Sequence, residues 1–434
     1  MNNYLQYPQK IQTKIQIECK QKIDFNLTTI KITLFGLPKD TGLPMKKESK
    51  AFGIITRNLF DLEPYYTFLK NAAENGHIVD HLIIAYEGEI NQSVLAKLQA
   101  KCQITLIKRG DSPILNSFLF ELGLTKEEVY SILGTPFNKK YKMIAYGTSR
   151  NYVLIAALML GINYLMFFDT DVYPKILSQF HNGKFDFINI DFVGSHLKYL
   201  KEKDVCLTTS DYTGYYIIPQ INFPNFKKLL YGVQKEGMFD AVSTNNIPVS
   251  KKNHSQNIVE TLKALGGNMA LDLSRIDILP PFFSTALVLD DECFLGRGED
   301  TLFGPEVHGA GRCMNIDLFV FHNCFGNFPK KPVITIQKNL DRFFYACMGW
   351  VIRNPFLNWI REKYSITFED FDKEKRYEAL LIGSKAAAEY FNDNRFLKLP
   401  RAYKSSYEKL GDDIKHYEEL MLVWKKLRQL INKE

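Results

Sequence analysis

The amino-acid sequence predicts an α/β protein whose central sheet is mostly parallel. From residue 51 onward, short apolar stretches with the character of strands alternate with helical stretches, which is typical of parallel strands joined by helices. The stretch YLMFF, residues 164–168, is continuously apolar, as expected for a strand that helices cover on both faces. Polar residues follow several of these strands, and ligands of such sheets bind beyond the carboxyl ends of the strands.

The first part of this alternation comprises three strands and two helices. The first helix is expected to close at Gly76, because glycine tolerates the left-handed conformation that ends many helices. The predicted strands cover 51–58, 79–89 and 103–110, and the predicted helices cover 63–76 and 90–102.

The next unit is a helix followed by a buried strand. TSRNYVLIAALMLG, residues 148–161, predicts a helix with Thr148 or Ser149 as its N-cap and Gly161 at its end. NYLMFFDTD, residues 163–171, predicts a fourth strand that ends on two carboxylates.

The middle of the chain has weaker patterns, and its elements are read from composition. Apolar and aromatic runs predict strands, FPNFKKLLYGVQKEG predicts a helix, and a polar stretch predicts a loop. The strands are expected at 184–194 and 214–223, the helix at 223–237 and the loop at 243–257.

The two ends of the chain differ from the middle. Alternating patterns predict strands at 14–25 and 29–36, and helical patterns dominate beyond residue 335. The last helix, 414–431, has an apolar stripe that predicts packing against the main domain; a membrane-surface or partner-binding helix is the alternative. The predicted parts are an N-terminal β extension with a basic arm (1–50), an α/β domain (51–335) and a helical region (336–434).

Charge and cysteine content exclude several classes of protein. Residues 1–50 hold nine Lys or Arg against four Asp or Glu, which is five of the seven excess positive charges. Such an arm either is a solvated face or contacts an anionic surface, and we expect no nucleic-acid partner. The seven cysteines lack CxxC spacing, which argues against a zinc site and a disulfide framework, although Cys313 and Cys324 could pair. Without a signal peptide or spanning segment, we expect a cytoplasmic protein, free or at a membrane surface.

The two carboxylates after the fourth strand predict a metal site. Residues two apart on a strand point the same way, so Asp169 and Asp171 would raise each other's pKa unless a cation lay between them. A hard divalent ion such as Mg²⁺ or Mn²⁺ satisfies two such carboxylates and can also clamp a diphosphate. A solvated turn, in which Asp171 caps a backbone group, is the alternative.

The segment TSRNYVLIAALMLGINYLMFFDTDVYP, residues 148–174, resembles glycosyltransferases of the GT-A fold, especially the large family-two type. Members of that family have an Arg-Asn pair at a helix start, an apolar stretch, a strand and then a metal-binding DxD motif. The resemblance implies a Rossmann-like GT-A fold, with Asp169 and Asp171 as metal ligands and Asp169 beside the nucleotide sugar. It also implies that Arg150 and Asn151 lie near the nucleotide, where a guanidinium suits a diphosphate.

A second segment, GRGEDTLFGPEVHGAGRCMNIDLFVFHN, residues 296–323, resembles the Glu-Asp segment of the same family. In inverting members the Asp is the general base, which implies that Asp300 deprotonates the acceptor hydroxyl and that Glu299 orients the acceptor. His322 is implied as a third metal ligand, with a structural role as the alternative. Two further candidates for acceptor contact, which also fit as ordinary loop acids, are Asp290 and Asp291.

Three shorter segments complete the resemblance. The stretch GGNMALDL resembles the glycine-rich loop near the donor sugar, which implies contacts from Gly267 and Asn268; an ordinary turn is the alternative. The ends of the first two strands correspond to nucleotide contacts. Those positions are Thr56, Arg57 and Glu87. Glu87 stands where the family more often has Asp, which leaves the identity of the nucleotide open.

Together these features predict a metal-dependent glycosyltransferase that moves a sugar from a nucleotide-sugar donor, UDP- or GDP-linked, to a carbohydrate or lipid-linked hydroxyl acceptor with inversion. A retaining enzyme and a non-catalytic scaffold that binds glycan or a partner are the alternatives. A nucleotidyltransferase fits less well, because TRNLFDLEP after the first strand lacks a glycine-rich basic loop.

Overall fold

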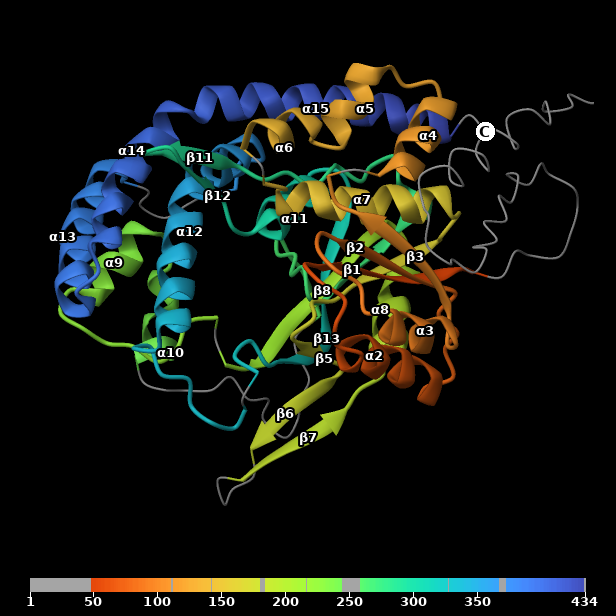
Figure 1. The fold of residues 1–434 in the computed structure, drawn as a ribbon, viewed down its shortest axis with the longest axis horizontal. Helices are drawn as coiled ribbons and strands as arrows, with labels where there is room; N and C mark the ends of the chain where they lie inside the picture. Colours follow the sequence, from red (N-terminus) through yellow and green to blue (C-terminus); the bar gives the residue numbers. More distant parts are fainter. Residues whose placement is uncertain are drawn as a thin grey trace, which may run out of the picture. The chain divides into compact units, whose positions relative to one another are not determined.

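The structure is a computed structural model (Figure 1). It describes residues 48–110, 112–141, 143–179, 184–215, 217–243, 258–326, 328–366 and 372–432. The predicted strands at 14–25 and 29–36, the basic arm and most of the predicted loop at 243–257 lie outside these residues. The described residues belong to one compact unit that begins at Lys47.

A nine-stranded sheet forms the centre of this unit, with the strand order β3-β2-β1-β4-β10-β8-β13-β5 and β9 paired to β13. Its strands are β1 (Lys50–Thr56), β2 (His81–Tyr86), β3 (Gln103–Lys108), β4 (Tyr164–Phe167), β5 (Val172–Tyr173), β8 (Val205–Gly214), β9 (Val259–Glu260), β10 (Met269–Asp272) and β13 (Arg312–His322).

Most of the sheet strands run in one direction. β1 is parallel to both β2 and β4, β2 is parallel to β3, and β8 is parallel to β13. β10 is antiparallel to its neighbours β4 and β8, so these two run the same way on either side of it. The predicted α/β class with a mostly parallel sheet is therefore confirmed, and the carboxyl ends of six strands meet at one edge.

Helices cover both faces of the sheet, and alternate residues of β4 serve the two sides. Leu165 and Phe167 belong to one core together with α4, α5, α7 and α11, whereas Met166 belongs to the other with α2, α3 and α8. These helices are α2 (Glu63–Glu74), α3 (Gln92–Gln99), α4 (Pro113–Glu121), α5 (Lys126–Ile132), α7 (Tyr146–Met159), α8 (Phe192–Leu200) and α11 (Glu299–His308). This two-sided burial explains why YLMFF is apolar without alternation.

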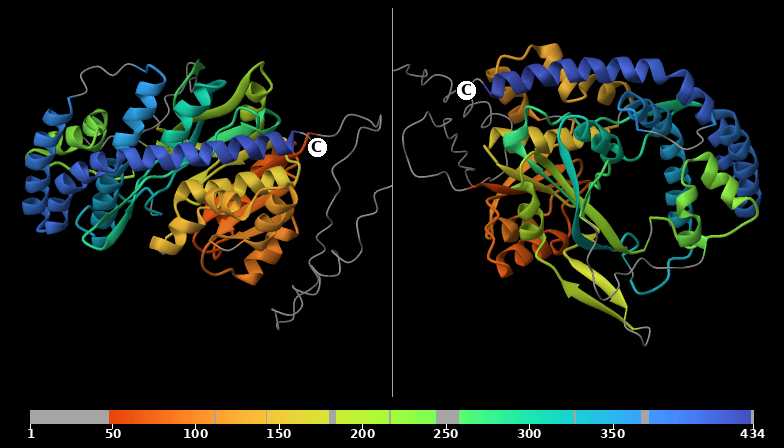
Figure 2. Two further views of the ribbon diagram at one scale, coloured as in Figure 1. Left: turned by 90° about the horizontal axis from the view of Figure 1, so that it is seen from above. Right: turned by 180° about the vertical axis from the view of Figure 1, so that it is seen from behind.

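The C-terminal part of the chain is helical, as predicted, and has a core of its own with α9. Its helices are α12 (Gln337–Lys363), α13 (Lys373–Phe391), α14 (Leu399–Glu408) and α15 (Leu410–Ile431), and α9 covers Phe226–Gly232. α15 passes over α5 and α6 (Thr135–Tyr141) on its way back to the sheet domain (Figures 1 and 2). The division of the chain into three parts stays a prediction.

Two short hairpins and a small helix lie outside the central sheet. The hairpins pair β6 (Lys175–Gln179) with β7 (Phe185–Asn189) and β11 (Ala286–Leu289) with β12 (Glu292–Leu295), and the helix is α10 (Phe239–Ser243). Among the described residues, no helix combines the length and the apolar character that crossing a bilayer requires.

Three sequence predictions are wrong in detail. α7 begins at Tyr146 after Ala145, so neither Thr148 nor Ser149 is its N-cap; Ser149 instead donates its hydroxyl hydrogen bond to the Ala145 carbonyl at 3.0 Å. Of the predicted strand at 214–223, only Gly214 is in a strand, because β8 ends at that residue; the described residues after it are not in a strand. Only the first part of 184–194 is a strand, since α8 starts within it.

The described cysteines form no disulfide. The Cys313–Cys324 bridge that their proximity in sequence allowed is therefore not present. Cys313 is instead next to Cys206, whose pKa is lowered chiefly by a hydrogen bond between the two thiols.

The docking of α15 gives a stability prediction. Trp424 is fully buried and its indole Nε1 donates to the Leu279 carbonyl at 2.9 Å. We expect Trp424→Ala to lower the free energy of unfolding by about 3–5 kcal/mol, because it leaves a cavity and removes the hydrogen bond of the indole. Urea denaturation would measure this change. Leu422→Ala, on the same helix but at a side chain that is 70% exposed, should change it by less than about 0.5 kcal/mol, and equal losses would contradict the packing role.

Candidate active site

Asp169 and Asp171 lie just beyond the carboxyl end of β4, where a tight turn leads into β5. The Val172 backbone N–H donates to the Asp169 carbonyl at 3.1 Å and closes this turn. β5 then pairs antiparallel with the end of β13, which sets Val172 opposite His322. The DxD segment is therefore held between two sheet strands.

The pairing of β5 with β13 brings Asp171 to His322. The Asp171 Oδ2 and His322 Nε2 atoms are 3.3 Å apart. Although burial acts to raise the pKa of the Asp171 carboxyl, the hydrogen bond and charge of His322, with the charge of Arg342, lower it below the usual value. Asp171 is thus an ionised carboxylate next to an imidazole.

Arg150 connects this turn to the second predicted segment. Its side chain is buried on α7, where Nε donates to Glu299 Oε1 at 2.7 Å and Nη1 donates to the Gly266 carbonyl at 3.2 Å. Its Nη2 is 3.5 Å from Asp169 Oδ1. Burial acts to lower the pKa of Arg150, but Glu299, Asp169 and Asp300 outweigh it and raise the pKa. One guanidinium thus serves both acidic segments.

The glycine-rich turn before β10 fits closely against these groups. A Cβ atom on Gly266 would lie 1.9 Å from Arg150 Nη2, and one on Gly267 would lie 2.8 Å from Asp169 Oδ2. The backbone N–H of Gly267 donates to the Tyr212 hydroxyl at 3.1 Å. Only glycine allows the backbone to approach this closely at both positions.

Glu299 and Asp300 open α11. The preceding Gly298 has φ of 91°, a left-handed conformation that turns the chain into the helix. Asp300 accepts hydrogen bonds from the backbone N–H of Gly266 at 2.7 Å and of Thr301 at 2.7 Å. Its carboxylate is therefore held in one orientation by two separate segments, as a positioned base would be.

Asp169 lies among like charges. The pKa of its carboxyl is raised to about 6, chiefly by desolvation; Arg150 acts to lower it, and Asp171, Glu299 and Asp300 act to raise it. Tyr212 is near the same carboxylates, and its pKa is raised by desolvation first and then by Asp169 and Asp300. The arrangement holds more negative charge than its cation balances, which favours a further cation.

The donor atoms partly match a divalent metal site. Among the described residues, no group of three or more His, Cys, Asp or Glu side chains is arranged to hold an ion. Asp171 and His322 are nevertheless adjacent, and carboxylate oxygen and imidazole nitrogen both suit Mn²⁺. Asp169 contacts Arg150 instead, so serving as the third ligand would require it to loosen that 3.5 Å contact.

The side chains of two predicted nucleotide contacts form hydrogen bonds with buried backbone groups. Asn151 exchanges two hydrogen bonds with the backbone of Phe282, at 2.9 and 2.8 Å. Asn268 is fully buried and its amide reaches the carbonyls of Asp211 and Leu318, at 3.3 Å each. The structure therefore gives both asparagines a part in positioning the loops around Arg150.

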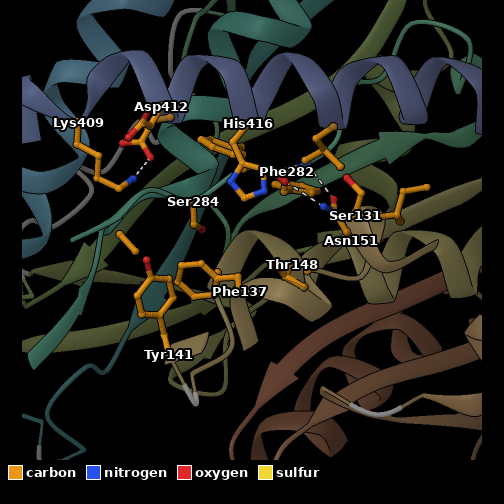
Figure 3. Close-up of a pocket in the computed structure, with 17 residues that line it drawn as sticks. Ser131, Phe137, Tyr141, Thr148, Asn151, Phe282, Ser284, Lys409, Asp412 and His416 are labelled. Carbon is orange, nitrogen blue, oxygen red and sulfur yellow. Dashed lines mark hydrogen bonds and ion pairs between the residues drawn. The ribbon is translucent and has the colours of Figure 1, made fainter. Parts of the chain in front are cut away.

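Asn151 also lines a cavity of about 310 Å³ between α7 and α15 (Figure 3). Apolar and polar side chains from α5, α6 and α7 form one wall of this cavity, and His416 of α15 and the Lys409–Asp413 pair at the start of that helix also line it. Figure 3 shows Phe137 and Tyr141 on the side opposite His416. None of the four acids described above lines it.

The remaining predicted nucleotide contacts follow β1 and β2, which are the strands next to β4 in the sheet. Thr56 is buried and donates to the Asn58 carbonyl at 2.8 Å, whereas Arg57 is exposed. Glu87 Oε2 is 3.6 Å from Nη1 of the buried Arg109. All three lie on the same edge of the sheet as the DxD turn.

Asp290 and Asp291 form the tip of the β11–β12 hairpin, both with positive φ. Asp290 pairs with Arg401 of α14 at 2.8 Å.

Tyr212 was not predicted as a site residue. It lies on β8, a strand that is too polar in sequence to be recognised. Nothing in the sequence indicates that Tyr212 lies beside Gly267.

No protein-family model matches this chain, and no curated protein matches it. Among solved structures, residues 1–349 of TarS from S. aureus share 10% identity, with 85% of this chain and 91% of that chain covered and a TM-score of 0.33. A mannosyltransferase from Pyrobaculum calidifontis in complex with GDP-Man and Mn²⁺ shares 10% identity, with 92% and 94% covered and a TM-score of 0.34.

Glucosyl-3-phosphoglycerate synthase from Mycobacterium tuberculosis, in complex with Mg²⁺ and UDP, shares 12% identity, with 71% of this chain and 79% of that chain covered and a TM-score of 0.36. Two of these three proteins are thus solved with a metal and a nucleotide or nucleotide sugar. At these identities and scores, the similarities assign neither substrate nor mechanism to this chain.

The Arg150–Glu299 pair gives a prediction with a matched control. Both side chains are buried, so Glu299→Gln should lower the free energy of unfolding by about 1–3 kcal/mol through loss of a charged hydrogen bond. Arg312 and Glu260 pair at the same 2.7 Å distance, but their side chains are 37% and 49% exposed. Glu260→Gln should therefore cost less than about 1 kcal/mol. Chemical denaturation of both variants tests this, and equal costs would contradict it.

The stability of the fold should depend on pH through His196, a buried residue that contacts Asn268. Its ring nitrogens lie 2.8 Å from Thr208 Oγ1 and 3.2 Å from Asn268 Oδ1, and desolvation lowers its pKa to about 3. Below about pH 6.5 the unfolded chain binds a proton at this residue that the folded chain does not, so stability falls with falling pH.

Between pH 6.5 and pH 5 this loss should reach about 2 kcal/mol at His196, at about 1.4 kcal/mol per pH unit. We expect His196→Gln to be less stable at neutral pH but to lose correspondingly less on acidification. Urea denaturation of both proteins across this range measures the two slopes. Parallel slopes would mean that His196 is not held neutral.

Proposed function

We propose that this protein is a metal-dependent glycosyltransferase of the GT-A type, which moves a sugar from a nucleotide-sugar donor to an acceptor hydroxyl with inversion. The observation that carries the proposal is the position of Arg150, which contacts Asp169 at the end of β4 and Glu299 at the start of α11. The two acidic segments expected to serve donor and acceptor therefore meet around one buried guanidinium.

The donor would bind at the carboxyl ends of β4, β1 and β2. Asp171 and His322, with Asp169, would hold Mn²⁺ or Mg²⁺, which when bound supplies the Lewis acidity that stabilises a departing diphosphate. Gly266 and Gly267 let the turn before β10 pack directly against Arg150 and Asp169, so this turn would border the bound donor. Thr56, Arg57 and Glu87 are proposed to contact the nucleoside, with UDP or GDP as the candidates.

Asp300 is the proposed general base. Its two backbone hydrogen bonds hold the carboxylate in one orientation, so it could accept the proton of an acceptor hydroxyl as that hydroxyl attacks the anomeric carbon. Attack from the face opposite the nucleotide gives inversion. Glu299 is committed to Arg150 at 2.7 Å, which makes it a positioning residue for the Gly266 turn and the DxD segment.

Two alternatives lead to different observations. A retaining enzyme would keep donor binding but would yield a product with the anomeric configuration of the donor. A non-catalytic scaffold would bind glycan or a partner without turning over a donor. The intact set of Asp169, Asp171 and Asp300 favours an enzyme, because a scaffold places no chemical requirement on these acids.

The first experiment is a thermal-shift screen of the full chain with Mn²⁺ and UDP-, GDP-, CMP- and dTDP-sugars. Ligands that bind the folded chain alone raise its melting temperature. We expect a metal-dependent shift with one nucleotide class, which Asp169→Ala abolishes and the exposed Glu260→Gln variant retains. A screen without any shift, or an undiminished shift in Asp169→Ala, would overturn the proposed donor site.

A second experiment tests the base. Asp300→Asn keeps the size of the side chain and leaves the proposed metal ligands in place, so the donor-induced thermal shift should persist. Transfer, or slow donor hydrolysis with water as acceptor, should fall by about 10²–10⁴-fold. A turnover that survives this substitution would exclude Asp300 as the base and reopen the retaining alternative, which the anomeric configuration of the product would then decide.

A further inference from the structure

Arg353 is a buried arginine on α12 with little to neutralise it. Its side chain is only 3% exposed. Nη2 donates to Asn354 Oδ1 at 2.8 Å, and Nε is buried without a hydrogen-bond partner. Within the described part of the chain, no carboxylate oxygen lies within 4.0 Å of this guanidinium. A buried arginine without an anion is costly, so this one requires an explanation.

The carboxylates in the neighbourhood have other partners. Glu299 pairs with Arg150 at 2.7 Å. Asp300 accepts two backbone hydrogen bonds. Glu236 pairs with Arg376 at 2.9 Å. These three acids are therefore each hydrogen-bonded to a group other than Arg353.

Arg353 points toward the start of α11, the ten-residue helix that carries Glu299 and Asp300. A Cβ atom added to Gly298 would lie 2.7 Å from Arg353 Nη1, so this nitrogen reaches the residue just before the helix. α11 and α12 pack against each other (Figure 1). The guanidinium thus lies beside the proposed base and at the positive end of a helix dipole.

A second cation, Lys235, lies next to Arg353. It follows α9, and its Nζ atom lies 5.1 Å from the centre of the Trp350 ring, one helical turn before Arg353 on α12. Asn354, the neighbour of Arg353, donates to the Val233 carbonyl at 2.9 Å and fastens the Lys235 segment to α12. The described residues place no carboxylate within 4.0 Å of Lys235 either.

The electrostatics support two unneutralised charges in one place. Desolvation first, and then the charge of Arg353, lower the pKa of Lys235 to about 7, while Asp300 acts in the opposite direction. Desolvation also lowers the pKa of Arg353 to about 10, with Asp300 acting in the opposite direction. Each cation is destabilised by burial, and an anion between them would relieve both costs.

We propose that Lys235 and Arg353 form a subsite for an anionic group, a phosphate or a carboxylate, on the acceptor whose hydroxyl Asp300 deprotonates. The assignment of this anion to the acceptor rests on the proposed function, whereas anion binding by these two side chains does not. A planar guanidinium can hold two oxygens of such a group, and the ammonium adds a point charge. The subsite would select a charged acceptor over a neutral sugar.

Binding of small anions to the metal-free full chain tests the subsite without any donor. The probes for titration calorimetry are glycerol phosphate, glycerate and the neutral control glycerol, with inorganic phosphate as a fourth. We expect glycerol phosphate or glycerate to bind and glycerol not to bind. The comparison of the first two probes distinguishes a phosphate site from a carboxylate site.

Two variants with a matched control locate the binding. Lys235→Gln and Arg353→Gln should each weaken anion binding at least about tenfold, while Lys228→Gln, an exposed lysine of α9, should leave it unchanged. Arg353→Gln is the variant with the greater risk of misfolding, because its side chain is buried. If Arg353→Gln fails to fold, the result for Lys235→Gln alone decides the test.

The subsite is overturned if none of the small anions binds, or if anion binding survives Lys235→Gln. If none of the small anions binds but both variants lose the thermal shift given by Mn²⁺ and a nucleotide sugar, the two cations bind the donor phosphates instead. If anion binding depends on Lys235 while no nucleotide sugar binds, the subsite stands and the proposed glycosyltransferase function fails.

Discussion

The arrangement of the candidate site depends on one buried cation. Arg150 leaves α7 in the interior, where an unpaired guanidinium would be costly. Glu299, Asp169 and the Gly266 carbonyl surround it, so the start of α11, the end of β4 and the turn before β10 must all converge on it. Phe167 lies 5.2 Å from its guanidinium carbon and closes the apolar side.

The sheet supplies the geometry that this convergence needs. β10 runs antiparallel between β4 and β8, which brings its preceding glycine turn to the edge where the parallel strands end. β13 then carries His322 to that edge by pairing with β5. Charge accumulates there because three acids share one arginine, and desolvation, with the neighbouring acids, raises the pKa of Asp169. The same edge therefore suits a cation and a diphosphate.

Elements with a strong local pattern could be predicted from sequence. The strands β1 to β4, the helices α2, α3 and α7 and the C-terminal helices all have apolar patterns that could be recognised, whereas α4, α5 and α6 were not predicted. β8 could not be recognised, because VCLTTSDYTG is polar in sequence. In the fold, Thr209 donates to the Asn268 carbonyl and Ser210 to the Ile316 carbonyl, so buried hydroxyls satisfy backbone groups that only the neighbouring strands provide.

The sequence by itself determined the α/β class and placed Asp169 and Asp171 after a strand, because hydrophobic period and the ends of apolar runs are local properties. Only the tertiary structure decided which charges meet. Arg150 and Glu299 are 149 positions apart, and Arg353 reaches α11 from a different helix. Charge pairing acts through space and leaves no periodic trace along the chain, so partners, pKa shifts and the unneutralised cations follow from the packing alone.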